Sequence, residues 1–279
     1  QRGIKINVLI DWYENQLSSK GLIHGFKHNS PNTKIIGYCG IIDSASYRVN
    51  LHPSEYEYDQ MLLPNQITVL GEDTKDDFME FTKNLNIISA PSLRYKYLHQ
   101  IERSNSKTSE FTILVALPIF KDQAENILSI LAESKASLEK IDNIRVNIKV
   151  HPTQSSEIYQ SLYDVESKNC KFVDGDFLEW VKAADLLVSA ASTTCMEALA
   201  IGVPVAIIGA KNQILQNPIP KSIHHDYWRI CYSSSELIGF VSAVYEIDKD
   251  NLTIESEKIR DSYFMLPTNK NIQKLINFQ

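Results

Sequence analysis

From residue 111 onward, short apolar segments alternate with longer stretches in which apolar residues recur every three or four positions. The short segments are rich in β-branched residues and have the length of buried strands, whereas the longer stretches have the periodicity of helices. Strands are predicted at 111–117, 144–150, 170–173, 185–189, 203–208 and 228–232, with one amphipathic helix between the first two and others at 155–167, 177–184, 193–200 and 234–245. Such alternation is typical of a parallel sheet covered by helices, so this half predicts a complete Rossmann-like domain.

The first part of the chain also has an α/β pattern. Strands are predicted at 4–10, 34–38, 67–70 and 86–88, and helices near 12–27, 75–85 and 92–102. The polar segment 102–110 contains no apolar residue, so we predict one domain at 1–105 and a second at 106–279. Because the chain starts at Gln1 and runs at once into a strand pattern, we interpret it as the latter part of a longer protein or a processed chain, with an incomplete first domain.

The C-terminal stretch 254–279 has helical periodicity and contains one proline, Pro267. Proline lacks the backbone N–H that a helix interior requires. We therefore expect the helix to end or kink there.

The composition is that of an ordinary folded protein. Hydrophobic residues make up 43% of the 279 residues and charged residues 22%, and this length suits two α/β domains of about 100 to 200 residues each. Asp and Glu number 34 against 28 Lys and Arg, which gives a net charge of −6. This charge repels nucleic acid, so a bound anion requires a local set of hydrogen-bond donors.

The cysteines and the hydropathy indicate the compartment. Cys39, Cys170, Cys195 and Cys231 are far apart and form no CxxC pair, which argues against a zinc site or a dense disulfide framework and fits a reducing compartment. Apolar runs stay well short of the roughly 18 to 20 residues that cross a bilayer, and the N-terminus lacks the apolar stretch of a secretory signal. We therefore expect a cytoplasmic protein.

Three hydroxyl residues follow the predicted strand 185–189. Ser192, Thr193 and Thr194 stand where the helix 193–200 begins, so their hydroxyls and the free backbone N–H groups could hold a phosphate. The alternative is that Ser192 or Thr193 only caps the helix. Glu197 lies about one turn further, where its carboxylate could accept hydrogen bonds from a ribose; the alternative is an ordinary solvated glutamate.

A second candidate site is the sequence Lys149-Val150-His151-Pro152. The predicted strand ends here, which brings the imidazole of His151 to the carboxyl edge of the sheet, where α/β proteins bind ligands. A neutral imidazole can donate a hydrogen bond to a phosphate oxygen, and a protonated one can offset its charge. The alternative is a histidine packed in a turn.

Two carboxylates of the first domain are candidates for acid–base chemistry. Asp11 and Glu14 follow the predicted strand 4–10 at a strand-to-helix junction, and Glu14 is the first choice for a general base or nucleophile. For Asp11 a helix-capping role is the alternative. A Walker loop, a GxSxG elbow and a catalytic Cys/His signature are absent, and we assign no Asp-x-Asp triplet to a metal. We expect neither a metal nor a cofactor.

The segment Glu197-Ala198-Leu199-Ala200-Ile201-Gly202-Val203-Pro204-Val205, with the preceding hydroxyl residues, resembles the donor-binding domain of GT-B glycosyltransferases. The resemblance covers roughly 111–245. It implies two Rossmann-like domains, a phosphate on the hydroxyls and helix N-terminus, and a ribose on Glu197. Together with Lys149, His151 and Pro152, the pattern is similar to bacterial transferases that use CMP-activated sialic acid or Kdo.

The first domain also contains sequences that resemble such enzymes, in the half that binds the acceptor. The string Trp12-Tyr13-Glu14-Asn15-Gln16 and the pair Gly71-Glu72 resemble Kdo-transferase-like enzymes of surface-carbohydrate synthesis. Many of those proteins have Gln-His where this chain has Cys39-Gly40. The resemblance implies an oligosaccharide or glycolipid acceptor.

We therefore predict a metal-independent glycosyltransferase that moves Kdo or a related nonulosonic acid from a CMP-sugar donor to a bacterial surface glycan. Peripheral association with the inner face of the cell membrane, or with other glycan-assembly enzymes, is compatible with such a role. The alternatives are a CDP-glycerol or CDP-ribitol phosphotransferase, a UDP-sugar GT-B enzyme, and a catalytically silent GT-B-like binding module of a larger synthase.

Overall fold

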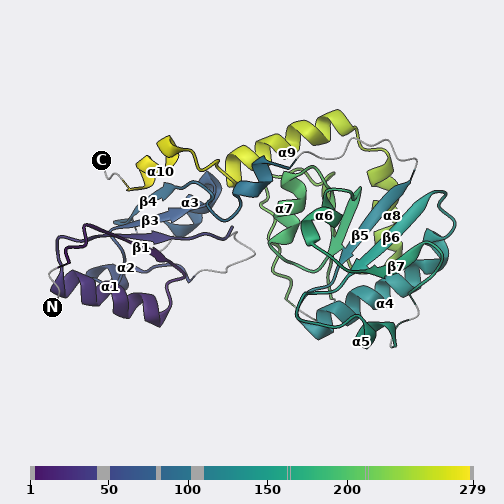
Figure 1. Ribbon diagram of the computed structural model, residues 1–279, viewed down its shortest axis with the longest axis horizontal. Helices are drawn as coiled ribbons and strands as arrows, with labels where there is room; N and C mark the ends of the chain where they lie inside the picture. Colours follow the sequence, from purple (N-terminus) through teal and green to yellow (C-terminus); the bar gives the residue numbers. More distant parts are fainter. Residues whose placement is uncertain are drawn as a thin grey trace. The chain divides into compact units, whose positions relative to one another are not determined.

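The computed structural model describes residues 4–42, 51–79, 83–101, 110–161, 163, 165–210, 212 and 214–276. It divides the chain into two compact units, residues 1–100 with 260–279 and residues 101–259 (Figure 1). The predicted domain border at 105 lies outside the described residues. The placement of 260–279 differs from the prediction, because this segment groups with the first unit and not with the second.

The second unit contains a six-stranded parallel sheet. Its strands are β5 (Phe111–Ala116), β6 (Ile144–Lys149), β7 (Cys170–Val173), β8 (Leu186–Ser189), β9 (Val205–Ile208) and β10 (Trp228–Cys231). They lie in the order β10-β9-β8-β5-β6-β7. After β5 the chain adds β6 and β7 on one side of it, and then adds β8, β9 and β10 on the other side. This order confirms the predicted Rossmann-like domain.

Helices of the second unit bury both faces of this sheet. The helix α4 (Lys121–Leu138) packs beside α8 (Ser234–Tyr245), and both contribute buried residues to the core on one face. The alternate residues Leu114, Leu187 and Ile207 are buried on the opposite face. The remaining helices are α5 (Glu157–Gln160), α6 (Phe177–Val181) and α7 (Thr194–Ala200), of which α7 packs against β8 and β9.

The predicted helix 155–167 is much shorter in the structure. Among the described residues of this stretch only α5 is an α-helix, because Val165 is buried in the core and the backbone of Ser167 pairs with that of Cys170. Helical periodicity alone could not reveal this competition between local helix and tertiary pairing.

The first unit contains a four-stranded parallel sheet in the order β1-β2-β3-β4. The strands are β1 (Val8–Trp12), β2 (Lys34–Tyr38), β3 (Gln66–Val69) and β4 (Asn86–Ser89), and the helices between them are α1 (Leu17–Asn29), α2 (Glu55–Asp59) and α3 (Glu72–Phe78). Each strand is added on the same side of the preceding one, so right-handed crossovers bring α1 and α3 to one face. Their side chains Ile23 and Phe78 lie in a core with Ile35 and Ile67.

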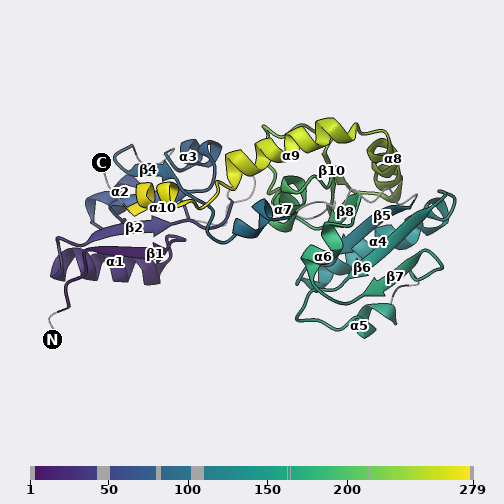
Figure 2. The ribbon, with the colours of Figure 1, turned by 45° about the horizontal axis from the view of Figure 1, so that its top comes forward.

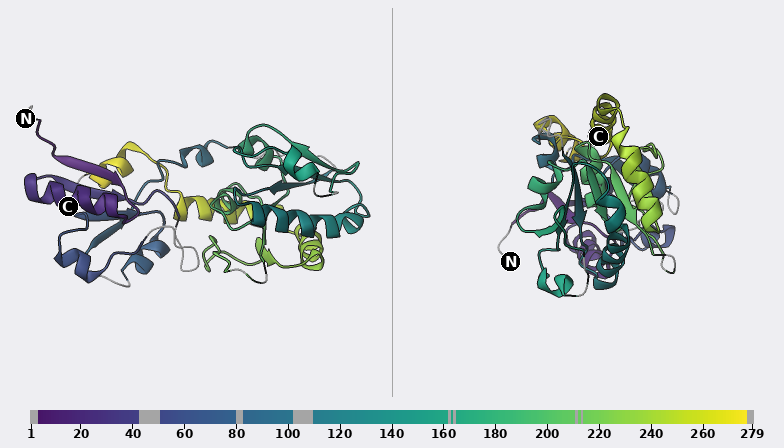
Figure 3. Two further views of the ribbon diagram at one scale, coloured as in Figure 1. Left: turned by 90° about the horizontal axis from the view of Figure 1, so that it is seen from below. Right: turned by 90° about the vertical axis from the view of Figure 1, so that its right-hand side faces the viewer.

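The C-terminal segment covers the other face of this sheet. The helix α9 (Lys249–Tyr263) ends before Pro267, and α10 (Asn269–Ile276) begins after it, which confirms the predicted break. Leu275 of α10 packs against Ile36, Tyr38 and Ala90. Figures 2 and 3 show α10 across this sheet, on the side opposite α1.

Two predictions for the first unit are wrong in detail. The first strand covers 8–12 and not 4–10, so Asp11 lies within the strand and pairs with Gly37. The predicted helix 92–102 is only the 3-10 turn η1 (Lys96–His99). The backbone before this turn makes tertiary hydrogen bonds. The N–H of Ser92 donates to the carbonyl of Met265, and the N–H of Leu93 donates to the Tyr38 hydroxyl.

Candidate functional site

The carboxyl ends of β5 and β8 form the switch point of the second sheet, because the chain departs from these two neighbouring strands in opposite directions. Open α/β sheets bind ligands at such a point. The N–H of Leu117 donates to the carbonyl of Lys149 at 2.9 Å, and the Ser189 hydroxyl donates to the carbonyl of Ala116 at 3.0 Å. The loops that follow β5, β6 and β8 therefore all begin at the same carboxyl edge of the sheet.

His151 lies in the loop after β6, two residues beyond Lys149, the last residue of that strand. Its Nδ1 atom accepts the backbone N–H of Thr153 at 3.3 Å and lies 2.8 Å from the Thr153 hydroxyl. A neutral imidazole that accepts this N–H carries its proton on Nε2. This leaves an N–H donor for a ligand, while Pro152 is exposed beside it.

The hydroxyl residues stand where the loop after β8 meets α7, with Thr194 as the first residue of the helix, and all three are half-buried. Thr193 is the N-cap residue of α7, yet its side chain makes no capping hydrogen bond. Ser192 accepts the N–H of Thr194 at 3.4 Å, which is a weak local turn contact. Helix capping thus uses none of the hydrogen-bonding capacity of the Thr193 hydroxyl and only part of that of the Ser192 hydroxyl.

Glu197 is not the ordinary solvated glutamate that was the alternative, because only 8% of its surface is exposed. Its neighbour Cys195 is fully buried. Burial raises the pKa of the Cys195 thiol to about 12, and the negative charge of Glu197 contributes in the same direction. A ligand that reaches Glu197 must therefore enter the fold beside α7. Contact with a ribose stays a prediction.

Sequence reasoning missed two residues at the switch point. Ile119 and Phe120 follow β5 and expose 49% and 63% of their surfaces. The side-chain amide of Gln154 donates to the carbonyl of Ile119 at 2.7 Å, which ties this loop to the loop of His151. The signal in the sequence was an apolar Leu-Pro-Ile-Phe run directly before a helix; such exposed apolar side chains could pack against a nucleobase.

The Asp-x-Asp triplets at 174–176 and 248–250 act as helix caps. Asp176 accepts the N–H of Leu178 at 2.7 Å at the start of α6, and Asp248 accepts the N–H of Asp250 at 2.8 Å near the start of α9. Within the part of the chain that the structure describes, no group of three or more Asp, Glu, His or Cys side chains could hold a metal ion.

In the first unit, Glu14 lies in the connection between β1 and α1 and not in the first helical turn. Its Oε1 atom accepts the indole N–H of Trp12 at 2.9 Å, and its Oε2 atom accepts the amide N–H of Gln16 at 2.7 Å. Asp11 does not cap α1, whose N-cap residue is Gln16. The Asp11 Oδ2 atom is buried and has no hydrogen-bond partner among the described residues.

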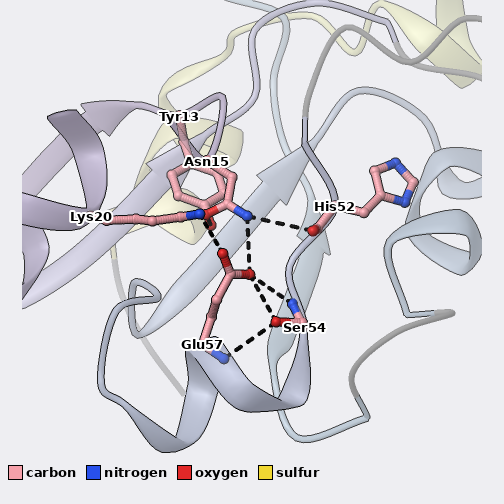
Figure 4. A network of polar contacts seen from close by, with 6 residues as sticks. All are labelled: Tyr13, Asn15, Lys20, His52, Ser54 and Glu57. Carbon is pink, nitrogen blue, oxygen red and sulfur yellow. Dashed lines mark hydrogen bonds and ion pairs between the residues drawn. The ribbon is translucent and has the colours of Figure 1, made fainter. Parts of the chain in front are cut away.

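A buried polar network supports this connection (Figure 4). Asn15 is 1% exposed and adopts a left-handed backbone with φ of 54°. Its side-chain oxygen accepts the Tyr13 hydroxyl at 2.9 Å, and its nitrogen donates to Glu57 at 3.3 Å and to the carbonyl of His52 at 3.5 Å. An unusual backbone conformation is thus held by three separate contacts.

Glu57 is the centre of this network. One of its oxygens accepts the N–H of Ser54 at 2.9 Å, and the other forms an ion pair with Lys20 of α1. Burial opposes ionisation of Glu57, but the hydrogen bonds from Lys20, Ser54 and Asn15 outweigh it and hold the pKa of this carboxyl below its usual range. The network therefore joins α1, α2 and the connection that carries Glu14.

Comparison with known proteins gives a family-model match over less than half of the chain and a likeness of fold. The family model described as "Putative glycosyltransferase (DUF6716)" matches residues 88–211. Among solved structures, the GtfA/B complex has a TM-score of 0.58 and 12% identity over 93% of this chain and 55% of that chain. The S. aureus MnaA structure with UDP has a TM-score of 0.59 and 10% identity, and the match covers 93% of this chain and 70% of that chain. The structure of spinosyn rhamnosyltransferase SpnG with thymidine diphosphate has a TM-score of 0.60 and 12% identity, and the match covers 97% of this chain and 73% of that chain. A comparison with curated proteins found no match.

The chain has the GT-B fold. It spans 55% of the length of the first of these structures, so the GT-B likeness concerns part of that protein. The matched family segment contains His151, the hydroxyl residues 192–194 and Glu197, but it does not contain Glu14. The family description supports the predicted glycosyltransferase class, and the roles of the individual residues stay predictions.

Within the described parts of this GT-B chain, none of the helices is long and apolar enough to span a bilayer.

We predict that Glu57→Gln lowers the free energy of unfolding of the first unit by about 1 to 3 kcal/mol at neutral pH, because it removes the charge that pairs with Lys20. A lowered carboxyl pKa stabilises the fold above the unfolded-state pKa, and this stabilisation is lost as the pH falls through the folded-state pKa. The difference between variant and parent should therefore shrink below about pH 4. Urea unfolding at several pH values measures it.

Asp59→Asn is the matched control, since Asp59 lies on the same helix and is exposed. Equal acid sensitivity of the parent chain and Glu57→Gln would contradict the assignment.

Proposed function

We propose that this chain is the nucleotide-sugar-binding part of a GT-B glycosyltransferase of bacterial surface-glycan synthesis. The supporting observation is the common carboxyl edge of β5, β6 and β8, from which the loops of His151 and of residues 192–194 leave. Neighbouring strands lie about 4.8 Å apart, so the ends of β6 and β8 on either side of β5 are about 10 Å apart. A phosphate with its flanking groups fits such a distance.

In this proposal the second unit holds the leaving nucleotide. The Nε2 proton of His151, the hydroxyls of Ser192, Thr193 and Thr194, and the charge of Lys149 act on the phosphate, while Glu197 accepts hydrogen bonds from the ribose. As the bond to the sugar breaks, negative charge grows on the phosphate, and prearranged donors stabilise it more than they stabilise the bound substrate. Protein groups, without a metal ion, thus assist departure of the nucleotide.

The first unit would supply the acceptor-side chemistry. Glu14 is fixed by Trp12 and Gln16 and can take the proton of an acceptor hydroxyl. Asp11 is the second choice, because it lies inside β1 and its environment is more enclosed.

We propose a CMP-activated acidic sugar, Kdo or a related nonulosonic acid, as donor, and an oligosaccharide or glycolipid as acceptor. The support is the Lys-x-His-Pro sequence together with the Ser-Thr-Thr cluster. A uridine or thymidine diphosphate sugar is the second candidate, because MnaA and SpnG were solved with UDP and with thymidine diphosphate.

A thermal-shift series with CMP, UDP, TDP and GDP tests the donor class. A ligand at about 100 times its Kd adds about 2.7 kcal/mol of stability, which raises Tm by several degrees for a chain of this size. We expect selective stabilisation by CMP. Selective stabilisation by UDP or TDP would replace the donor in the proposal, and stabilisation by none of the four would overturn the nucleotide site.

We predict that Thr193→Val with Thr194→Val weakens CMP binding by about 1 to 3 kcal/mol, the loss typical when a charged acceptor forfeits hydrogen bonds. Calorimetry measures the affinity. Thr253→Val is the control, because Thr253 is exposed on α9 and its hydroxyl donates to the carbonyl of Lys249 in the same helix. Unchanged affinity in a folded double variant would leave the two hydroxyls without a role in donor binding.

His151→Ala should lower kcat with the intact sugar nucleotide by about 10²-fold while it weakens binding of free CMP much less, because the charge on the leaving phosphate grows in the transition state. Single-turnover kinetics beside CMP calorimetry separates the two effects. Equal losses would make His151 a binding residue only, and no loss in either would make the His-Pro sequence a simple turn.

Glu14→Gln should reduce kcat by about 10² to 10⁴, the contribution of a general base, without changing CMP affinity or Tm. The amide keeps the size of the side chain and can still accept the Trp12 indole N–H. Release of CMP from the sugar nucleotide in the presence of acceptor measures the rate. Full activity in Glu14→Gln would transfer the role to Asp11, and a large fall in Tm would mark Glu14 as structural.

A further inference from the structure

Trp12, the last residue of β1, is a large apolar side chain that the fold leaves open. It exposes 44% of its surface, although Tyr38, which pairs with it on β2, and the following residue Tyr13 are buried. The other part of the indole packs closely, since a methyl group added at Gly40 would lie 2.3 Å from its ring and the Tyr38 ring lies 6.0 Å away between centroids. The ring is thus fixed in place and presented to solvent.

Two polar side chains flank this ring. The Glu14 carboxylate accepts the indole N–H, and the Gln16 amide donates to the same carboxylate, so the three side chains form one connected group. A flat apolar surface beside a carboxylate and an amide matches a pyranose sugar, which has an apolar C–H face surrounded by hydroxyl donors and acceptors.

The support under this group is rigid. The intervening residue Asn15 is buried in the left-handed conformation and is bonded to Tyr13 and Glu57, and the N–H of Leu51 donates to the Glu14 carbonyl at 3.2 Å. Alternate residues of the connection therefore point inward to the network and outward to Trp12. A binding surface on such a base loses little entropy when a ligand binds.

We propose that Trp12, Glu14 and Gln16 form a sugar-binding subsite in which a neutral pyranose ring of the acceptor stacks on the indole and directs a hydroxyl to Glu14. The acceptor assignment rests on the proposed function, whereas sugar binding itself does not. Trp12 is then a specificity-determining residue, which selects a ring with an open apolar face.

The test uses the full chain labelled with ¹⁵N and follows the indole N–H signals of Trp12, Trp180 and Trp228 during titration. The probe is methyl β-D-glucopyranoside, and sorbitol, which has the hydroxyls without the ring, is the control ligand. Trp12→Phe assigns the signal, and Trp180→Phe is the matched control because the Trp180 indole also donates a hydrogen bond, to the Asp174 carbonyl in the second unit.

We expect the glucoside to move only the Trp12 signal, with a Kd on the order of 1 mM, and sorbitol to move none. Gln16→Ala should weaken binding about fivefold through one lost hydrogen bond. Gly40→Ala should also weaken it, because the added methyl displaces the ring while Trp12 remains as the reporter. A stationary Trp12 signal, equal shifts at Trp180, or unchanged affinity in Gln16→Ala would overturn the subsite.

CMP titration of the same sample separates this outcome from the proposed function. Glucoside binding without stabilisation by any nucleotide would retain the sugar subsite and overturn the transferase assignment. Nucleotide binding with a stationary Trp12 signal would overturn the subsite alone.

Discussion

The pairing of β5 with two strands at once is the constraint on which the second unit depends. Ala116 is level with Lys149 of β6 and with Ser189 of β8, so three strands end together. A shift of one residue in either pairing would turn every side chain of that strand to the other face, and in β6 it would exchange the exposed Arg145 with buried apolar residues. The hydrophobic requirement of the two faces therefore fixes the register, and the register fixes where the His151 loop and the hydroxyl loop begin.

The two units offer opposite kinds of polar group. The second unit presents donors at the sheet edge, namely an imidazole N–H and hydroxyls, in a chain whose net charge of −6 would otherwise repel a phosphate. The first unit presents a carboxylate that is held by an indole and an amide. Donors suit a departing anion, and a carboxylate suits a hydroxyl that must lose a proton. These are the two kinds of group that the proposed transfer reaction uses.

The first unit also shows how a half-buried charge can organise a loop. Removal of Glu57 from water is costly, and the fold compensates with Lys20, Ser54 and Asn15 on the two oxygens. Because these partners come from α1, the start of α2 and the connection after β1, the carboxylate is satisfied only when all three segments are in place. The position of Glu14 is thus linked to the folding of the whole unit.

The sequence by itself determined some of the local elements. Strand β2 and helix α8 have the predicted bounds, and the break at Pro267 lies where expected, because side-chain periodicity and a missing N–H act over a few residues. The sequence also identified the loops of His151 and Ser192, since both directly follow apolar strands. Only the tertiary structure decided the rest: the placement of α10 on the first sheet, the burial of Glu197, the contact of the His151 Nδ1 atom with the N–H of Thr153 and the network around Glu57. Each of these depends on residues far apart in the chain or on side-chain geometry, which hydropathy patterns do not encode.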